Sequence, residues 1–215
     1  MPPKKTTNGA PAGSFAKRIA NLAVEQWKFF GRQAYDLAGH ATTVGHKEGE
    51  PTFFQKVGEY WRDGVDRPDL DGLDHSWPWS AAFISWVMRT AGAGNQFRYS
   101  AQHSVYVSKA IRDHLQGRQN VAYHGVRLNE QTPEVGDVVC WSRQAGIDYD
   151  NQNSGDYKGH TDIVVAVQPK AIEIIGGNVG NSVTRRPLAL DSAGFLVPTV
   201  QGGETLFGLM KNLLG

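Results

Sequence analysis

The sequence contains a single cysteine, Cys140, among 215 residues. One cysteine cannot form an internal disulfide, nor can it supply the paired cysteines of a structural zinc site. No apolar run approaches the roughly 20 residues that a membrane-spanning helix needs. The formal net charge is only +1, which gives no general attraction to nucleic acid or to membranes. We therefore expect neither nucleic acid nor a membrane span among the binding partners and features of this protein.

The first residues are basic, but they lack the apolar core that a signal peptide requires. Residues 1–13 are rich in Pro, Gly, Lys and Thr, a composition that predicts a disordered tail. The rest of the chain, residues 14–215, is long enough for one sizeable domain, and no linker divides it. We predict a single domain that is made in the cytoplasm without classical secretion.

Two hydrophobic periods divide the chain. Apolar residues recur at helical spacing before residue 120, and from about residue 121 they alternate with polar residues. The predicted helices cover residues 14–30, 33–37, 52–61, 76–91 and 99–115. The predicted strands cover residues 135–141, 159–167, 171–175, 181–190 and 203–210. Helices followed by hairpin-spaced strands indicate an α+β fold, with the N-terminal helices packed on a central antiparallel sheet.

The stretch 77–87 combines a turn with an almost wholly apolar helix. Ser76 is the expected N-cap and Pro78 the expected first helical residue. Ser80 then lies in the first turn, where free N–H groups and the helix dipole favour developing negative charge. Ser80 is therefore a candidate nucleophile, and its alternative role is to help cap the helix.

Further polar candidates lie on neighbouring predicted elements. His103 opens the helix that follows, and it shares a face with Tyr106 three residues later. His160 and Asp162 alternate onto one face of a strand. Cys140 lies on the strand expected to pair with that one, so the thiol is a second candidate nucleophile. Its alternative is a plain buried strand residue.

Four motifs occur in one order along the chain. They read Trp-Ser-Ala-Ala-Phe-Ile-Ser-Trp at 79–86, Pro-Glu-Val-Gly-Asp-Val-Val at 133–139, Gly-His-Thr-Asp-Ile-Val at 159–164 and Gly-Asn-Val-Gly-Asn-Ser-Val at 177–183. Each motif is weak by itself, but the ordered set resembles the CHAP and NlpC-type cell-wall amidase superfamily. The resemblance is to a bacterial branch with serine at the usual cysteine position, and it implies a papain-like fold.

The resemblance also assigns roles to residues. Ser80 stands where the family has its cysteine nucleophile, His160 stands at the position of the base, and Asn178 stands at the position that orients the imidazole. These three would transfer an acyl group without a cofactor. A serine at a helix N-terminus is not readily ionised as a cysteine is, so it depends more strongly on its base.

Three alternatives remain open. Cys140 can replace Ser80 as the nucleophile. The fold can be inactive and serve as a binding module for the cell wall or a protein. For the active or the inactive form, the predicted substrate-binding residues are Trp79, His103 and Trp141. A metal-dependent hydrolase can use His103, His160 and Asp162, although these three are too few to assign a metal.

The leading hypothesis is a hydrolase of an amide bond in peptidoglycan. Because no signal peptide is expected, specialised export is the expected route, either as a type VI-like antibacterial effector or as a lysin. An immunity protein and a component of the secretion apparatus are the corresponding protein partners. The expected place of action is the target periplasm or cell wall.

Overall fold

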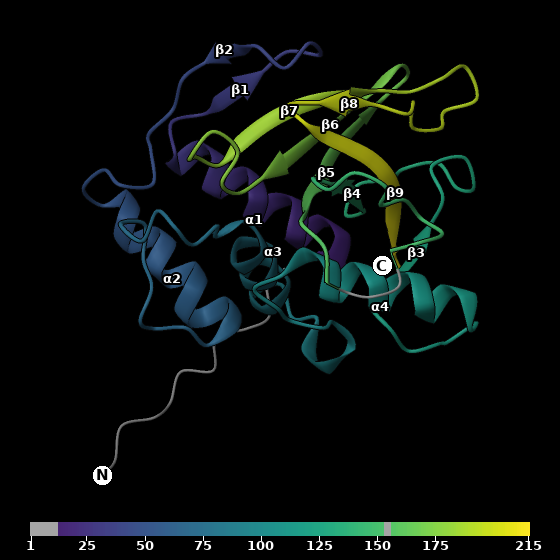
Figure 1. Cartoon of the computed structure of the whole chain (residues 1–215), viewed down its shortest axis with the longest axis horizontal. Helices are drawn as coiled ribbons and strands as arrows, with labels where there is room; N and C mark the ends of the chain where they lie inside the picture. The colour runs from purple at the N-terminus through teal and green to yellow at the C-terminus, as the bar shows by residue number, and fades with distance from the viewer. Residues whose placement is uncertain (1–12, 153–155) are drawn as a thin grey trace.

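The computed structural model describes residues 13–152 and 156–215, and it confirms the predicted α+β class (Figure 1). The predicted disordered tail lies outside these residues, except for Gly13. The helices of the described part are α1 Phe15–Phe29, α2 Phe53–Val65, α3 Ser80–Thr90, α4 His103–Leu115 and a short 3-10 helix η1 Gly94–Gln96. None of the helices in this part of the chain is long and apolar enough to cross a membrane.

One curled sheet holds all the strands of the described residues, in the order β2-β1-β7-β6-β5-β4-β9-β3, with β8 beside β9. The strands are β1 Gln33–Tyr35, β2 Ala41–Thr43, β3 Tyr123–Val126, β4 Val138–Ser142, β5 Gly159–Gln168, β6 Ala171–Gly176, β7 Thr184–Ala189, β8 Val200–Gln201 and β9 Glu204–Asn212. All neighbours are antiparallel except β1 and β7, which are parallel. The predicted antiparallel sheet is therefore correct apart from this pair.

The segment predicted as a helix at residues 33–37 is wrong, because it forms strand β1. Gly31 and Arg32 have positive φ values of 81° and 61°, which turn the chain away from α1. The side chain of Gln33 then donates to Thr184 Oγ1 on β7 at 2.7 Å. This long-range bond holds the segment in the sheet, and no local pattern of the sequence predicts the bond.

The first helix illustrates what local chemistry does decide. Ser14 is its N-cap and accepts a hydrogen bond from the N–H of Lys17. Phe15, Ile19 and Ala23 recur at helical spacing and are all buried. The buried stripe faces the sheet, so α1 lies where its sequence predicts.

The sheet has an apolar core on each face. The helices cover one face, and α2 packs against α3 rather than on the sheet (Figure 1). The core on the helix side includes Ile19, Trp61, Phe83, Val107, Cys140, Ile163 and Ile175. The core on the other face includes Val126, Val139, Trp141, Val164, Ile174, Leu188, Leu206 and Leu209. Successive residues along β4, and likewise along β5, thus point alternately to the two cores.

Candidate active site

The helix that carries Ser80 begins later than predicted. Ser80 is its first residue and Trp79 is the N-cap, so Ser76 and Pro78 belong to the preceding loop. The N–H of Trp77 bonds back to Asp74, which holds that loop in a turn. The first helical hydrogen bond runs from Phe83 to Trp79, so the N–H of Ser80 and those of the next two residues precede the helical ladder. These three N–H groups therefore have no carbonyl acceptor within the helix.

The closest partner of Ser80 is His103, the first residue of α4. Ser80 Oγ lies 2.6 Å from His103 Nε2, and the two side chains are only 2% and 7% exposed. The prediction placed His103 at a substrate-binding position. The structure instead places its imidazole against the candidate nucleophile.

Two hydroxyls hold the other nitrogen of this imidazole. His103 Nδ1 is 2.9 Å from Thr161 Oγ1 and 2.5 Å from Tyr106 Oη, which are themselves 2.9 Å apart. In the tautomer with its proton on Nδ1, His103 donates to one of these hydroxyls, and Nε2 is free to accept the Ser80 proton. The spacing of His103 and Tyr106 was a usable sequence signal for this contact. Nothing local indicated Thr161.

Burial sets the charge of His103. It lowers the pKa of the imidazole well below its ordinary value, and positive charge at His160 and Arg143 lowers it further. The carboxylate of Asp162 acts in the opposite direction but does not reverse the shift. His103 is therefore neutral near neutral pH, which is the state that a general base requires.

His160 is not the partner of Ser80, and that prediction is wrong for the observed geometry. His160 is fully buried, with Nε2 at 3.2 Å from Asp162 Oδ1. Its Nδ1 has no hydrogen-bond partner within the described chain. The His160 and His103 rings are 5.2 Å apart between centroids. His103 reaches Ser80 from the start of α4 and takes the acceptor position that the prediction gave to His160.

Asp162 Oδ1 accepts a hydrogen bond from the imidazole of His160. Its second oxygen accepts from Trp141 Nε1 and from Arg186 Nη2, each at 2.8 Å. Burial raises the pKa of Asp162, but the positive charges of Arg186 and His160 outweigh that effect, and the pKa lies below its ordinary value. Asp162 is therefore ionised and accepts a hydrogen bond from His160 Nε2–H.

The two tryptophans that were predicted as binding residues are buried. Trp141 is 1% exposed and its indole N–H is bonded to Asp162. Trp79 is 2% exposed, and its indole N–H donates to Glu48 Oε2 at 2.5 Å. Both rings are packed in the interior, so they position charged groups rather than offer a surface to a ligand.

Asn178 does not orient an imidazole. With its amide oriented to suit its neighbours, Asn178 donates to Glu48 Oε2 at 3.1 Å and accepts from the backbone N–H of Trp79 at 3.3 Å. Its φ of 58° places it in the left-handed region, which turns the β6–β7 connection toward α3. Asn178 therefore caps the helix of Ser80, and the orienting role that was predicted for it belongs to Asp162.

Cys140 does not fit a nucleophilic role. It lies directly opposite Thr161 in the β4–β5 register, whereas Trp141 lies opposite His160. Opposed residues of an antiparallel pair share a face, so the thiol points away from the face of His160. Cys140 is 1% exposed, and burial raises the pKa of its thiol far above the ordinary value. The alternative of a plain buried strand residue describes it.

The metal-dependent alternative finds no ligand group. Within residues 13–152 and 156–215, no three His, Cys, Asp or Glu side chains are grouped so that they could hold a metal ion. His103 Nε2 faces Ser80 and His160 Nε2 faces Asp162. The Nε2 atoms of both histidines are thus already hydrogen-bonded.

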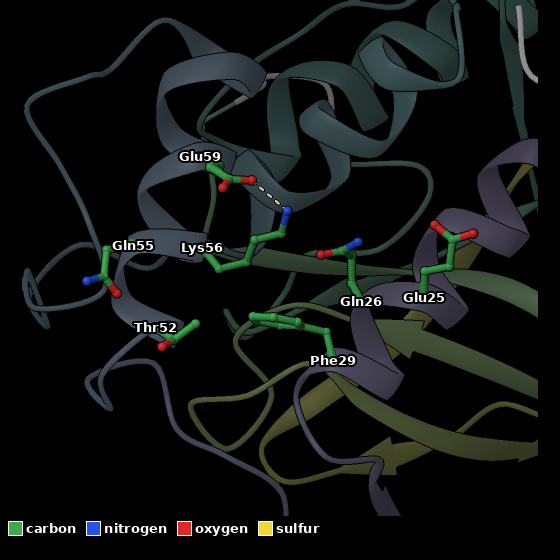
Figure 2. Close-up of a pocket in the computed structure, with 7 residues that line it drawn as sticks. All are labelled: Glu25, Gln26, Phe29, Thr52, Gln55, Lys56 and Glu59. Atoms are coloured by element: carbon green, nitrogen blue, oxygen red, sulfur yellow. Dashed lines mark hydrogen bonds and ion pairs between the residues drawn. The ribbon is translucent and has the colours of Figure 1, made fainter.

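Two cavities are candidate substrate sites. The larger, of about 530 Å³, lies between α1 and α2, where Phe29 and Gln26 face Lys56 and its ion-pair partner Glu59 (Figure 2). It contains none of the predicted site residues. A second cavity of about 410 Å³ is lined by Asn178, which also caps the Ser80 helix. The second cavity is therefore the one that adjoins the candidate active site.

Comparisons with known proteins gave one match. The model of a family described as "Uncharacterized protein conserved in bacteria (DUF2272)" matches residues 24–205. No curated protein and no solved structure matches the chain. The matched range includes Ser80, His103 and His160, so the whole candidate site lies within it.

Proposed function

The chain belongs to the DUF2272 family of bacterial proteins, and we propose that it is a serine-dependent hydrolase of an amide bond in peptidoglycan. The observation that carries this proposal is the 2.6 Å contact between Ser80 Oγ and His103 Nε2 at the start of a buried helix. A nucleophile within hydrogen-bond reach of an uncharged base is the arrangement that acyl transfer needs. The peptidoglycan substrate is supported by the ordered motif resemblance to cell-wall amidases.

The proposed reaction begins when His103 Nε2 takes the proton of Ser80 as Oγ attacks the amide carbonyl carbon. The N–H groups at the start of α3 stabilise the oxyanion of the tetrahedral intermediate. The carbon–nitrogen bond then breaks, and the imidazolium of His103 returns the proton to the leaving amine. Water hydrolyses the acyl-Ser80 ester with His103 again as base. Thr161 and Tyr106 hold Nδ1 throughout.

His160 is a positioning residue in this scheme. Its ring packs beside that of His103, and its Nε2 is hydrogen-bonded to Asp162. A rotation of Ser80 toward the unpartnered Nδ1 would make His160 the base instead, which is the family assignment. Variants of the two histidines distinguish these schemes.

A second candidate function is binding without turnover, and one observation favours it. Ser80 is only 2% exposed, so a substrate carbonyl reaches Oγ only if a covering group moves. If no such movement occurs, the protein binds a cell-wall peptide or another protein in the cavity beside Asn178 without cleaving it. Turnover separates the two functions.

We further propose action in the target periplasm or cell wall after specialised export, as a type VI-like effector or a lysin with an immunity protein as partner. Expression directed to the periplasm of a Gram-negative host is then expected to reduce viability. Cytoplasmic expression is expected to be harmless, and the Ser80→Ala variant is expected to be harmless in both compartments.

The decisive experiment measures release of new amino groups from purified peptidoglycan. Wild type is compared with Ser80→Ala and Cys140→Ala, each with and without EDTA. Activity of wild type and Cys140→Ala, unaffected by EDTA and absent in Ser80→Ala, supports the serine mechanism. A folded wild type that binds peptidoglycan but releases no amine contradicts the hydrolase and supports the binding module.

A further inference from the structure

The cavity beside Asn178 has an unusual charged wall. Its lining comes from β1 and the β1–β2 turn, the residue after β4, the β6–β7 turn, β7, and the β8–β9 hairpin. The lining residues are Tyr35, Ala38, Gly39, Arg143, Asn178, Val179, Gly180, Arg186, Gln201, Gly202 and Glu204. At about 410 Å³ its volume is within the range of small-ligand sites. The charged residues of the lining are two arginines and one glutamate.

Arg186 is held by several hydrogen bonds, but one of its nitrogens has no acceptor. Its Nη2 donates to Asp162 at 2.8 Å and to Glu204 at 3.1 Å, and its Nη1 lies 3.3 Å from Gln201 Oε1. The side chain is 5% exposed, and its Nε has no hydrogen-bond partner within the described chain. A buried donor without an acceptor is costly, so this nitrogen is a position where an acceptor from a ligand would be stabilising.

Arg143 supplies the second cation, and it is more accessible. Its Nε donates to Glu204 Oε1 at 2.5 Å, and its side chain is 37% exposed. Glu204 therefore lies between the two guanidinium groups and bonds to both. Asp162 also pairs with Arg186, so the carboxylates of Glu204 and Asp162 together offset the charges of both guanidinium groups.

Asn178 links this wall to the reacting atoms. It lines the cavity and accepts from the N–H of Trp79, which directly precedes Ser80. On the other side, Arg186 bonds to Asp162, which holds His160. A ligand in the cavity thus lies beside groups that contact both the nucleophile helix and the paired histidines.

We propose that this cavity is a subsite for a peptide carboxylate, bound by Arg143 and Arg186. The planar fork of a guanidinium matches a carboxylate in two parallel hydrogen bonds. The subsite would select acidic peptides and orient them toward Ser80. Its orienting role rests on the proposed hydrolase function, whereas the binding itself does not.

Binding is measured by isothermal titration calorimetry in the Ser80→Ala background, which prevents turnover. The probe is the stem tetrapeptide L-Ala-γ-D-Glu-diaminopimelate-D-Ala, compared with the same peptide after conversion of its carboxylates to amides. We expect the acidic peptide to bind at least tenfold more tightly. Arg143→Gln should weaken its binding roughly 10- to 100-fold, as the loss of hydrogen bonds to a charged group does.

A steric variant and a matched control complete the test. Ala38→Trp fills the cavity from an exposed rim residue and should abolish binding without altering either arginine. Arg127→Gln removes an arginine of similar exposure that pairs with Asp150 outside the cavity, and it should bind like the parent. Thermal unfolding of each variant verifies that it is folded.

The contrary results are equally specific. No binding of the acidic peptide, equal binding of the amidated peptide, or unchanged binding in Arg143→Gln and Ala38→Trp would each overturn the subsite. Inorganic phosphate that binds as tightly as the peptide would reduce the site to a simple anion site and also overturn the assignment. Carboxylate-dependent binding by a chain that releases no amine from peptidoglycan supports the subsite while the hydrolase fails.

Discussion

Ser80 Oγ lies 2.6 Å from His103 Nε2, although the two residues are 23 positions apart and open different helices. The N-terminus of α3 and the N-terminus of α4 therefore meet beside β5. This meeting gives a serine the base that it needs, since a serine at a helix N-terminus does not ionise by itself. The relationship makes His103, rather than His160, the centre of the predictions that follow.

The first prediction concerns the two histidines. His103→Gln keeps a polar side chain of similar length but cannot take a proton, so amine release from peptidoglycan should fall at least about 100-fold. His160→Gln should reduce the rate less, because His160 makes no hydrogen bond to Ser80. Urea unfolding of both variants controls for folding. A larger loss in His160→Gln would return the role of base to His160.

The second prediction concerns the thiol. Because Cys140 is buried and its pKa is raised, iodoacetamide should leave wild-type activity unchanged. In Ser80→Cys the new thiol lies at a helix N-terminus beside an imidazole, where a thiolate is favoured. The same reagent should therefore inactivate that variant. Mass spectrometry of the modified residue is the measurement, and rapid labelling of Cys140 in folded wild type would contradict it.

The third prediction concerns pH. The folded-state pKa of His103 is below its ordinary value of 6.5, so below pH 6.5 the unfolded chain binds more protons than the folded one. The contribution of this group to the free energy of unfolding is therefore fully present above pH 6.5. It decreases as the pH falls from 6.5 toward the lowered pKa. Activity should persist into mildly acidic solution, because the base stays neutral there.

Urea titrations between pH 7.5 and 5 test this slope. The control is His103→Gln, in which the part of the slope that belongs to His103 should be missing. The same pH dependence in wild type and variant would show that His103 does not titrate differently on folding.

The fourth prediction concerns the buried ion pair. Asp162→Asn leaves Arg186 buried with reduced compensation and removes the acceptor that orients His160. The free energy of unfolding should fall by about 3 kcal/mol, as for other broken buried pairs. Asp150→Asn breaks the exposed pair with Arg127 and should produce no measurable change. Similar stabilities of the two variants would contradict the structural importance of Asp162.

The fifth prediction concerns the cap of the Ser80 helix. Asn178→Gly removes both side-chain hydrogen bonds but tolerates the φ of 58°. Asn178→Ala removes the same bonds and adds the strain of a left-handed alanine, so it should be less stable than the glycine variant by about 1 kcal/mol. Thermal unfolding compares the two variants directly. Equal stabilities would mean that the backbone relaxes at this position.

Local patterns of the sequence determined most elements. Capping chemistry at Ser14, apolar spacing in α1 and alternation in β5 each depend on residues within a few positions, so they can be recognised without a structure. The strand β1 could not, because its conformation depends on a bond from Gln33 to Thr184, 151 positions later. The α+β class was predictable, but the one parallel strand pair was not.

The sequence also identified Ser80, His103, His160 and Asp162 as polar groups of interest, and the alternation rule correctly placed the last two on one face. Only the tertiary structure decided which of them touch. The contact of His103 with Thr161 spans 58 positions and depends on how α4 packs on β5, and the β4–β5 register decides that Cys140 faces Thr161 rather than His160. A sequence period reports which face of an element a side chain occupies, whereas a hydrogen bond of 2.6 Å depends on the packing of whole elements against one another.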